Sequence, residues 1–357
     1  MTMPAGADID IALELAEGRV VGVRIVPRRL PPIGALVAGR PAADLLRIVP
    51  RLFTLCAAAH GAAAQTAVDA ANGIRVAPAV RRQRAAAVLS ERLVEQLRSA
   101  VTGLRLLEQG AIATAMRELI SASASFASAA DSGIPDRLRA IARIELALDQ
   151  IGIAGLNPTD DSLAARFSPS GIVYLSSGDD LEVIARLVRD GARYASAPDI
   201  DGAVPETGPW ARLGADTAID GQPGDRAETA AARLQARLDE IVRMPRMLRG
   251  LATGEDDSPL ADLTGYCLGD GGGAAAVETA RGRLYHHVEL DAGGRVNRFQ
   301  CLAPTEWNFH PRGPLARMLR GSTLAGNSGG RSAVEQLVAA FDPCVGYTVT
   351  VREVADA

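Results

Sequence analysis

The chain of 357 residues contains no lysine, so all 38 of its basic residues are arginine. Because alanine is also abundant, this bias indicates the composition of the genome rather than a mechanism. The formal net charge is −4, which gives nucleic acid or an anionic membrane surface no general attraction to the chain. We therefore expect neither of them as a partner.

Long apolar runs and export signals are missing as well. No uninterrupted apolar stretch reaches the roughly 18 residues of a membrane-spanning helix, and the opening MTMPAGADID has neither the basic nor the apolar part of a signal peptide. The four cysteines are widely spaced, which argues against a disulfide framework and for a reducing compartment. We expect a cytoplasmic protein without a membrane span.

The apolar pattern predicts a mainly α protein with β hairpins near both ends, an α+β fold. Residues 8–16 and 19–27 alternate apolar and polar side chains on either side of Glu17-Gly18, which is typical of a hairpin. Helical periods then dominate 41–195.

The last part of the chain returns to β patterns. RGRLYHHVEL and VNRFQCLAP flank the turn sequence DAGGR, which predicts a second hairpin. Residues 196–225 are rich in Pro, Gly and Asp and are predicted to be a linker or loop. The expected organisation is one unit, 1–357, with an N-terminal hairpin in 1–27, the helical region 41–195, the linker or loop 196–225 and a C-terminal helix and hairpin part, 226–357.

Two cysteines stand in distinctive surroundings. Cys56 and His60 are four residues apart in RLFTLCAAAH, so on a helix they share a face, and Phe53 lies on it too. A cysteine on an Ala-rich helix is more often a small core side chain, and the histidine would then be a hydrogen-bonded core residue. Cys344 follows Asp342 and a proline at the end of a helical pattern, which by itself is only a stop signal.

The other candidate groups predict no chemistry. Cys267 and Cys301 have no Cys or His at ligand spacing, and His286 and His287 are neighbours in a strand, where side chains point to opposite faces. GDGGGAAA lacks the preceding strand of a nucleotide-binding loop. No Ser-His-Asp set, Walker loop or HExxH helix occurs. On chemistry alone the chain is an α-rich protein without an assigned role.

Three segments together resemble the large subunit of nickel–iron hydrogenases. RLFTLCAAAH is similar to the motif R-[IV]-C-G-x-C-x-x-x-H, and ARGRLYHHVELDAGGRVNRFQCLAPTEWNFHPRG to P-R-G-x-L-x-H … Y-Q-x-x-x-P-T-x-W-N. FDPCVGYTV is similar to D-P-C-x-x-C-x-x-H. The resemblance implies a large-subunit-like fold in which the C-terminal part converges with residues 51–60.

The chain departs from these motifs at the nickel ligands. In the family each motif supplies two thiolates. Here Phe53 replaces the first cysteine of the N-terminal pair, and Tyr347 replaces the bridging cysteine of the C-terminal pair. Thr350 replaces the closing histidine, and the proton-transferring glutamate aligns loosely with Gly6. Nickel in a thiolate site needs several soft ligands, so the resemblance implies no nickel and no hydrogenase activity.

The iron side of the family's site is retained. An iron that carries cyanide and carbon monoxide needs few protein ligands, and Cys56 and Cys344 are the candidate metal ligands. Cys344 matches a nickel-only ligand, so it would have to shift toward iron, or a partner's cysteine would have to replace it. Ala280 stands in place of a family proline. The residues expected to contact the diatomic ligands or the sulfurs are His60, Arg281, Thr305 and Asp342.

This pattern resembles the large-subunit-like hydrogenase maturation proteins of the HupK/HoxV type. The resemblance implies a non-catalytic scaffold or carrier that holds Fe(CN)2(CO) transiently, with a maturation chaperone of the HypC/HupF type and the hydrogenase large-subunit precursor as partners. A metal-free chaperone or large-subunit mimic, in which both cysteines are relics, stays open. An enzyme with residual redox chemistry is disfavoured by Phe53 and Tyr347.

Overall fold

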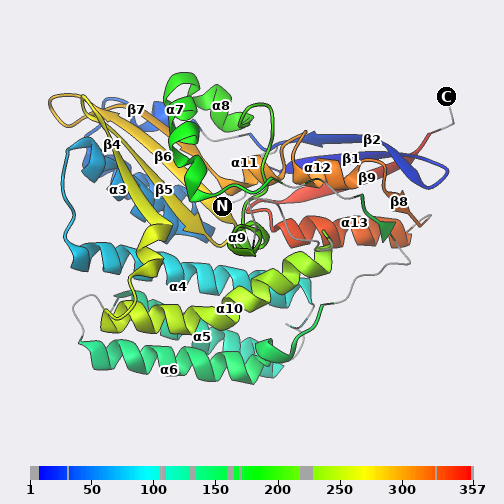
Figure 1. Cartoon of the computed structure of the whole chain (residues 1–357), viewed down its shortest axis with the longest axis horizontal. Helices are drawn as coiled ribbons and strands as arrows, with labels where there is room; N and C mark the ends of the chain where they lie inside the picture. The colour runs from blue at the N-terminus through cyan, green and yellow to red at the C-terminus, as the bar shows by residue number, and fades with distance from the viewer. Residues whose placement is uncertain are drawn as a thin grey trace.

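The computed structural model describes residues 8–29, 32–104, 106, 110–128, 133–158, 165–168, 171, 173–217, 228–325 and 328–354. Within them, two β-sheets lie toward opposite ends of the long axis, and long helices form a layer along one side (Figure 1). The predicted α+β class is confirmed, with more strand than two hairpins.

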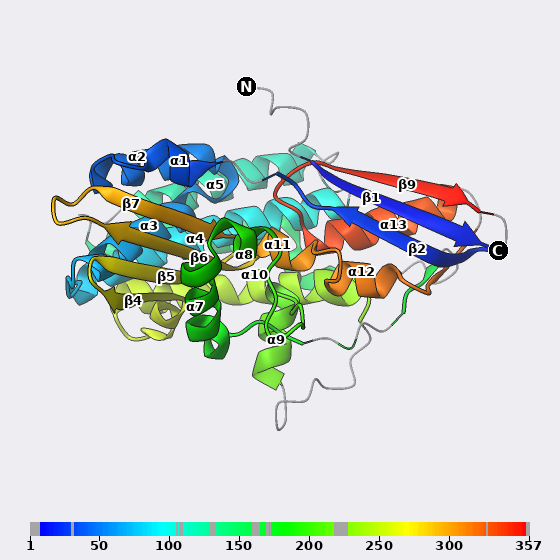
Figure 2. The same ribbon diagram turned by 90° about the horizontal axis from the view of Figure 1, so that it is seen from above.

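The first sheet joins the two ends of the chain. β1 (Ile9–Ala16) and β2 (Arg19–Val26) form the predicted antiparallel hairpin. Glu17 and Gly18 both have positive φ, 48° and 75°, as a tight two-residue hairpin turn requires. β9 (Tyr347–Glu353) runs parallel to β1 and was not predicted as a strand. Figure 2 shows these three strands side by side. The short strands β3 (Ala165–Arg166) and β8 (Thr323–Leu324) complete the order β3-β8-β2-β1-β9.

The second sheet is a four-stranded antiparallel meander. It contains the predicted second hairpin as β6 and β7, and a further hairpin, β4 and β5, that the glycine-rich stretch GDGGGAAA had concealed. Every residue of β5 is buried. The strands are β4 (Leu263–Gly269), β5 (Gly272–Thr279), β6 (Gly282–Leu290) and β7 (Val296–Leu302).

Helix α3 packs unusually close to this sheet. A Cβ atom at Gly273 in β5 would clash with the backbone of Ala67 and Ala71 in α3. Small side chains on both surfaces therefore bring backbone against backbone. Because α3 begins directly after Cys56, this contact also fixes the position of Cys56 relative to β5 and β6.

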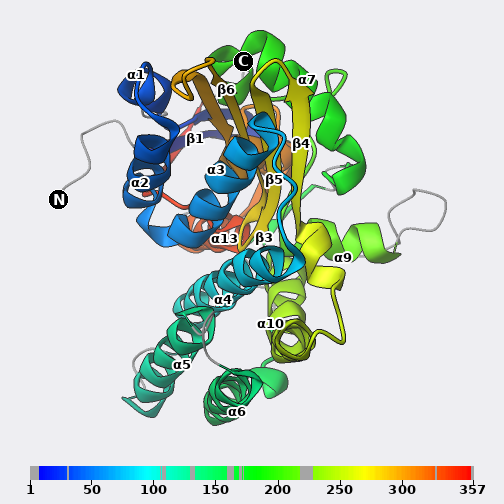
Figure 3. The ribbon, with the colours of Figure 1, turned by 90° about the vertical axis from the view of Figure 1, so that its left-hand side faces the viewer.

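Other helices cover the two faces of the second sheet (Figure 3). The α1–α3 group lies on one face, and α7 and α8 lie on the other. Their bounds are α1 (Ile33–Val37), α2 (Ala42–Leu52), α3 (Ala57–Ala71), α7 (Asp180–Asp190) and α8 (Ala192–Ser196). The shorter helices α11 (Pro304–Asn308) and α12 (Pro314–Leu319) precede α13 (Ser328–Phe341), which packs against the first sheet.

Four long helices form a separate layer with its own apolar core. Figure 3 shows α5 and α6 extending away from the sheets, while α4 and α10 connect this layer to the rest. These helices are α4 (Pro78–Gly103), α5 (Gly110–Ser128), α6 (Ile134–Ile151) and α10 (Ala230–Thr253).

The predicted linker or loop 196–225 is built into the fold where the structure describes it. Residues 196–208 are mostly irregular but partly buried, and α9 (Pro209–Thr217) follows them. Glu206 is 2% exposed and accepts hydrogen bonds from Nε and Nη2 of Arg233, at 2.9 and 2.6 Å. This ion pair and the buried side chain of Val204 anchor the segment to the rest of the fold. Residues 218–225 lie outside the described part.

The contact between α3 and β5 can be tested by adding one methyl group. We expect Gly273→Ala to lower the free energy of unfolding by about 1–3 kcal/mol, because the α3 backbone must move. Gly103→Ala, where the added Cβ meets no described atom within 4 Å, is the matched control and should leave stability unchanged or raise it by up to about 1 kcal/mol. Urea unfolding measures both, and equal midpoints would show that α3 is not held this closely.

Candidate metal centre

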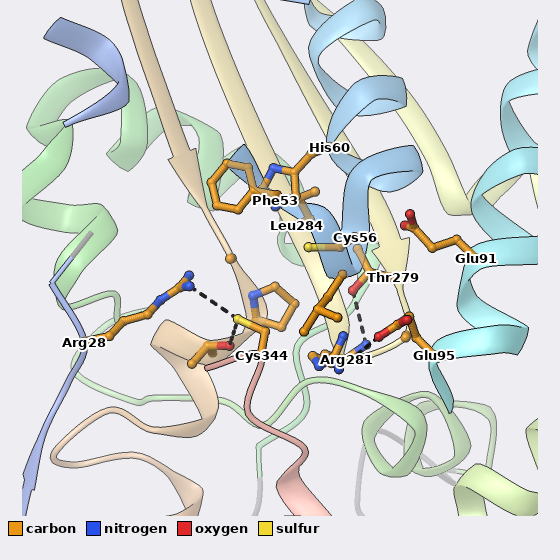
Figure 4. A pocket seen from close by; sticks show the side chains of 15 residues that line it. Arg28, Phe53, Cys56, His60, Glu91, Glu95, Thr279, Arg281, Leu284 and Cys344 are labelled. Atoms are coloured by element: carbon orange, nitrogen blue, oxygen red, sulfur yellow. Dashed lines mark hydrogen bonds and ion pairs between the residues drawn. The ribbon is translucent and has the colours of Figure 1, made fainter. Parts of the chain in front are cut away.

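Cys56 and Cys344 line the same cavity (Figure 4). Its free volume is about 20 Å³, roughly the space of one water molecule. The walls come from the start of α3, from α4, from the turn between β5 and β6, and from the loop after α13. Residues near opposite ends of the sequence therefore meet at one site.

Cys56 lies in the turn that connects α2 to α3. A short 3-10 helix, Thr54–Cys56, ends there, and α3 begins at Ala57. The exposed N–H groups of that helix end donate to Glu91 of α4, from Ala58 at 2.6 Å and from Ala59 at 3.0 Å. Glu91 thus caps α3 and holds the cysteine turn against α4.

Burial keeps Cys56 protonated at neutral pH. It raises the pKa of the Cys56 thiol, and the nearby Cys344 sulfur and the Glu91 carboxylate raise it further. A metal takes the thiolate form, so binding at Cys56 releases a proton.

Cys344 has polar neighbours that suit a negatively charged sulfur. Arg28 Nη1 donates to its Sγ at 3.3 Å, and Thr305 Oγ1 lies 3.2 Å from the same atom. Glu306 Oε1 holds Arg28 in place through Nε at 2.7 Å. Burial opposes the charge of Arg28, but Glu306 and Cys344 outweigh it and raise the pKa of the guanidinium. Arg28 therefore stays charged beside the sulfur.

Arg281 lies in the turn between β5 and β6, with its side chain 10% exposed. Its Nε donates to the backbone oxygen of Asp342 at 3.1 Å and lies 3.3 Å from the Asp342 carboxylate. Its Nη2 donates to Glu95 at 3.4 Å. Within the described part of the chain, Nη1 has no hydrogen-bond partner. Arg281 is thus anchored by carboxylates and still offers a donor, and it lines the cavity of both cysteines.

His60 makes its contacts away from the sulfur. Its ring stacks on Phe53 with centroids 3.6 Å apart, and its Nδ1 lies 2.9 Å from His286 Nε2. Burial lowers the pKa of both histidines, that of His286 to about 3, so one neutral ring donates to the other. The predicted hydrogen bond to Cys56 is not among the bonds of the described residues.

The adjacent histidines of β6 do point to opposite faces, as predicted. His286 lies on the α3 side, and His287 lies on the other, with its Nε2 3.6 Å from Glu289. We still interpret the remaining two cysteines as structural residues. Cys267 is exposed on β4, and Cys301 is partly buried on β7.

Sequence reasoning missed several residues of this site. Nothing local distinguishes Arg28 and Glu306, which meet only through the tertiary fold. The spacing of Glu91 and Glu95 by four residues could have placed both on one face of α4. The missed residues with direct contacts in the site are Arg28, Glu91, Glu95, His286 and Glu306.

The positions that lost cysteine no longer present donors to the cavity. The Phe53 ring occupies the space beside His60, and Tyr347 packs with the apolar core of the first sheet. Thr350 is exposed on β9, while Gly6 lies outside the described residues. Among the residues that the structure describes, no group of three or more His, Cys, Asp or Glu is arranged to hold a metal ion.

Comparison with solved structures identifies the fold. The [NiFeSe] hydrogenase of Desulfovibrio vulgaris Hildenborough superposes with a TM-score of 0.61 at 15% identity, over 92% of this chain and 94% of that chain. An NAD+-reducing [NiFe]-hydrogenase gives a TM-score of 0.56 at 18% identity, over 92% and 93% of the two chains. At such low identity the likeness shows a common fold of the [NiFe]-hydrogenase large-subunit type.

Sequence comparison is more specific. Residues 257–349 match the nickel-dependent hydrogenase family. The hydrogenase expression/formation protein HupK of Bradyrhizobium diazoefficiens is 42% identical over the full length of both chains, and HoxV of Cupriavidus necator is 32% identical over 89% of this chain and 90% of that protein. No helix in the described ranges is long and apolar enough to cross a membrane. The chain therefore belongs to the family of hydrogenase expression/formation proteins that includes HupK and HoxV.

Proposed function

We propose that this protein is a non-catalytic scaffold of [NiFe]-hydrogenase maturation. It holds the Fe(CN)2(CO) unit during assembly and passes it to the hydrogenase large subunit. The observation that carries the proposal is the single cavity shared by Cys56, Cys344 and a guanidinium donor of Arg281. A maturation chaperone of the HypC/HupF type delivers the cargo, the large-subunit precursor receives it, and both steps take place in the cytoplasm.

The donor set suits an iron that brings its own diatomic ligands. Cyanide and carbon monoxide occupy much of the iron's coordination sphere, so two soft thiolates complete the binding. Cyanide accepts hydrogen bonds, and Arg281 Nη1 supplies a charged donor to it. Arg28 and Thr305 hold the Cys344 sulfur from the other side and compensate part of the thiolate charge.

Loading requires the cavity to widen. Its present volume of about 20 Å³ admits one water-sized group, and iron with three diatomic ligands is larger. Leu55 belongs to the cavity wall and is 36% exposed, so it can move toward solvent without opening the core.

A metal-free chaperone that mimics the large subunit is the second candidate. The apolar packing of Phe53 and Tyr347 favours it, because these residues restore a stable core where ligands were lost. Under this alternative the protein binds maturation factors through its large-subunit-like surface, and the cysteines carry nothing. A hydrogenase-like enzyme is disfavoured by the same two residues.

Infrared spectroscopy separates the two candidates. Protein purified anaerobically from cells that make the iron unit should show cyanide and carbon monoxide bands and about one iron per chain. Cys56→Ala should retain far less of both, because one of the two thiolates is gone. Cys267→Ala removes an exposed cysteine outside the cavity and should behave like the parent. Absence of the bands from the parent would favour the metal-free chaperone.

The role of Arg281 is tested by a substitution that keeps its charge. Arg281→Lys keeps a positive charge near Glu95 and Asp342 but removes the planar fork of donors. We expect near-parental stability, weaker retention of the iron unit and lower hydrogenase maturation in a complementation assay. Arg98→Lys, which alters a half-exposed partner of Glu95, is the control. If Arg281→Lys matured hydrogenase like the parent while Cys56→Ala did not, the cyanide contact would be wrong.

Nickel should not bind tightly and stoichiometrically, since the cavity offers only two sulfurs. A chelator competition assay measures this, and a single added thiol sharpens it. Phe53→Cys places a third sulfur on the cavity wall and should raise nickel affinity about tenfold or more. Tyr347→Cys adds one within the first sheet's core and should not. Tight equimolar nickel in the parent would revive the enzyme interpretation.

A further inference from the structure

A second cavity lies on another side of Arg281. Its free volume is about 10 Å³, close to the space of one water molecule. Arg281 lines both this cavity and the one that holds the cysteines. The other residues that matter for the argument are Glu206, Trp210, Arg233, Arg237 and Phe341.

Two buried donors of the residues that line this cavity have no hydrogen-bond partner among the residues that the structure describes. Arg237 is 3% exposed, and its Nε makes no hydrogen bond in the described part of the chain. Trp210 is 5% exposed, and its Nε1 is likewise unpaired there. A buried donor without an acceptor costs about 1–3 kcal/mol, and more for a charged group. Two such donors among the residues that line one small cavity indicate that it holds an acceptor.

The cavity also carries an excess of positive charge. Arg233 is neutralised by its two bonds to Glu206, and it stacks over Trp210 and Phe341. Arg237, in contrast, bonds only to the backbone oxygen of Ala340, at 2.9 Å, and forms no ion pair with any described residue. Asp342 stabilises its charge from a greater distance, but burial still lowers the pKa of Arg237.

Helix α9 adds to the positive electrostatic potential in this cavity. Its first residue, Pro209, lies on the cavity wall, and a helix of nine residues presents the positive end of its dipole there. A water molecule would also need acceptors for its own hydrogens. The Glu206 carboxylate already accepts from Arg233 and Asn308 Oδ1 from the Thr207 backbone, so each of these oxygens offers a water only a further lone pair. An anion needs donors alone.

We propose that this second cavity binds one small monovalent anion of halide size, held by Arg237 Nε and Trp210 Nε1. Because the cavity has about the space of one water molecule, its walls must move outward slightly for a halide and much further for phosphate or a carboxylate. The proposal does not depend on the cargo, because it rests on donors outside the cysteine cavity. The bound anion shares Arg281 with that cavity and thereby provides a path by which halide changes the cargo pocket.

Bromide is the probe. It replaces gluconate stepwise at constant ionic strength in a solution of the full-length protein. We expect bromide to raise the thermal unfolding temperature of the parent with saturation, as a ligand of the native state does, and to quench its tryptophan fluorescence over the same range. Arg237→Met should raise the half-saturating bromide concentration at least tenfold. Trp210→Phe, which keeps the ring beside Arg233, should raise it severalfold. Arg243 is exposed on α10, the helix that also carries Arg237. Arg243→Met should therefore leave the half-saturating bromide concentration unchanged.

A second measurement decides the question even if Arg237→Met fails to fold. The parent should broaden the chloride-35 NMR signal more than Trp210→Phe does. Added bromide should reverse this broadening. If the parent shows no saturable bromide effect and no chloride broadening beyond Trp210→Phe, the cavity holds only water and the proposal is wrong. An equal, non-saturating rise of the unfolding temperature in all variants would be a general salt effect and would overturn it too.

Discussion

The backbone contact between α3 and β5 is the constraint on which the candidate site depends. Because Gly273 has no side chain, α3 settles onto the sheet, and its N-terminal turn brings Cys56 to the end of β5 and β6 where Arg281 projects. Glu91 then fixes that turn to α4 through two backbone N–H groups. A larger residue in β5 would lift the cysteine away from its arginine, so the glycine-rich stretch has a positional role.

Cys344 is positioned by contacts between distant parts of the chain. β9 pairs with β1 in parallel, and the loop that precedes β9 carries Cys344 to Arg28 and Thr305. Local alternation in the sequence was enough to predict the first hairpin, since its turn residues and strands are adjacent. It could not predict β9, whose partner is at the far end of the chain, nor Arg28, whose role appears only when Glu306 holds it beside the sulfur.

The site lacks two of the family's cysteine ligands but keeps the positively charged arginines around its sulfurs. Phe53 and Tyr347 now stabilise the core, while guanidinium groups still surround the sulfurs, each anchored by a carboxylate so that it stays charged when buried. Motif comparison could identify Cys56, Cys344, Arg281, Thr305 and Asp342 as one cluster. It could not show that His60 bonds to His286, because that pairing depends on the stacking of its ring against Phe53.

We propose that one iron is held jointly by the two cysteines. X-ray absorption at the iron edge of the loaded protein tests it most directly, since sulfur and diatomic carbon neighbours scatter at distinct distances. The account predicts two sulfur neighbours in the parent and one in Cys344→Ala, with the diatomic carbons unchanged. An iron without sulfur neighbours, or one whose sulfur count does not respond to Cys344→Ala, would contradict the shared site.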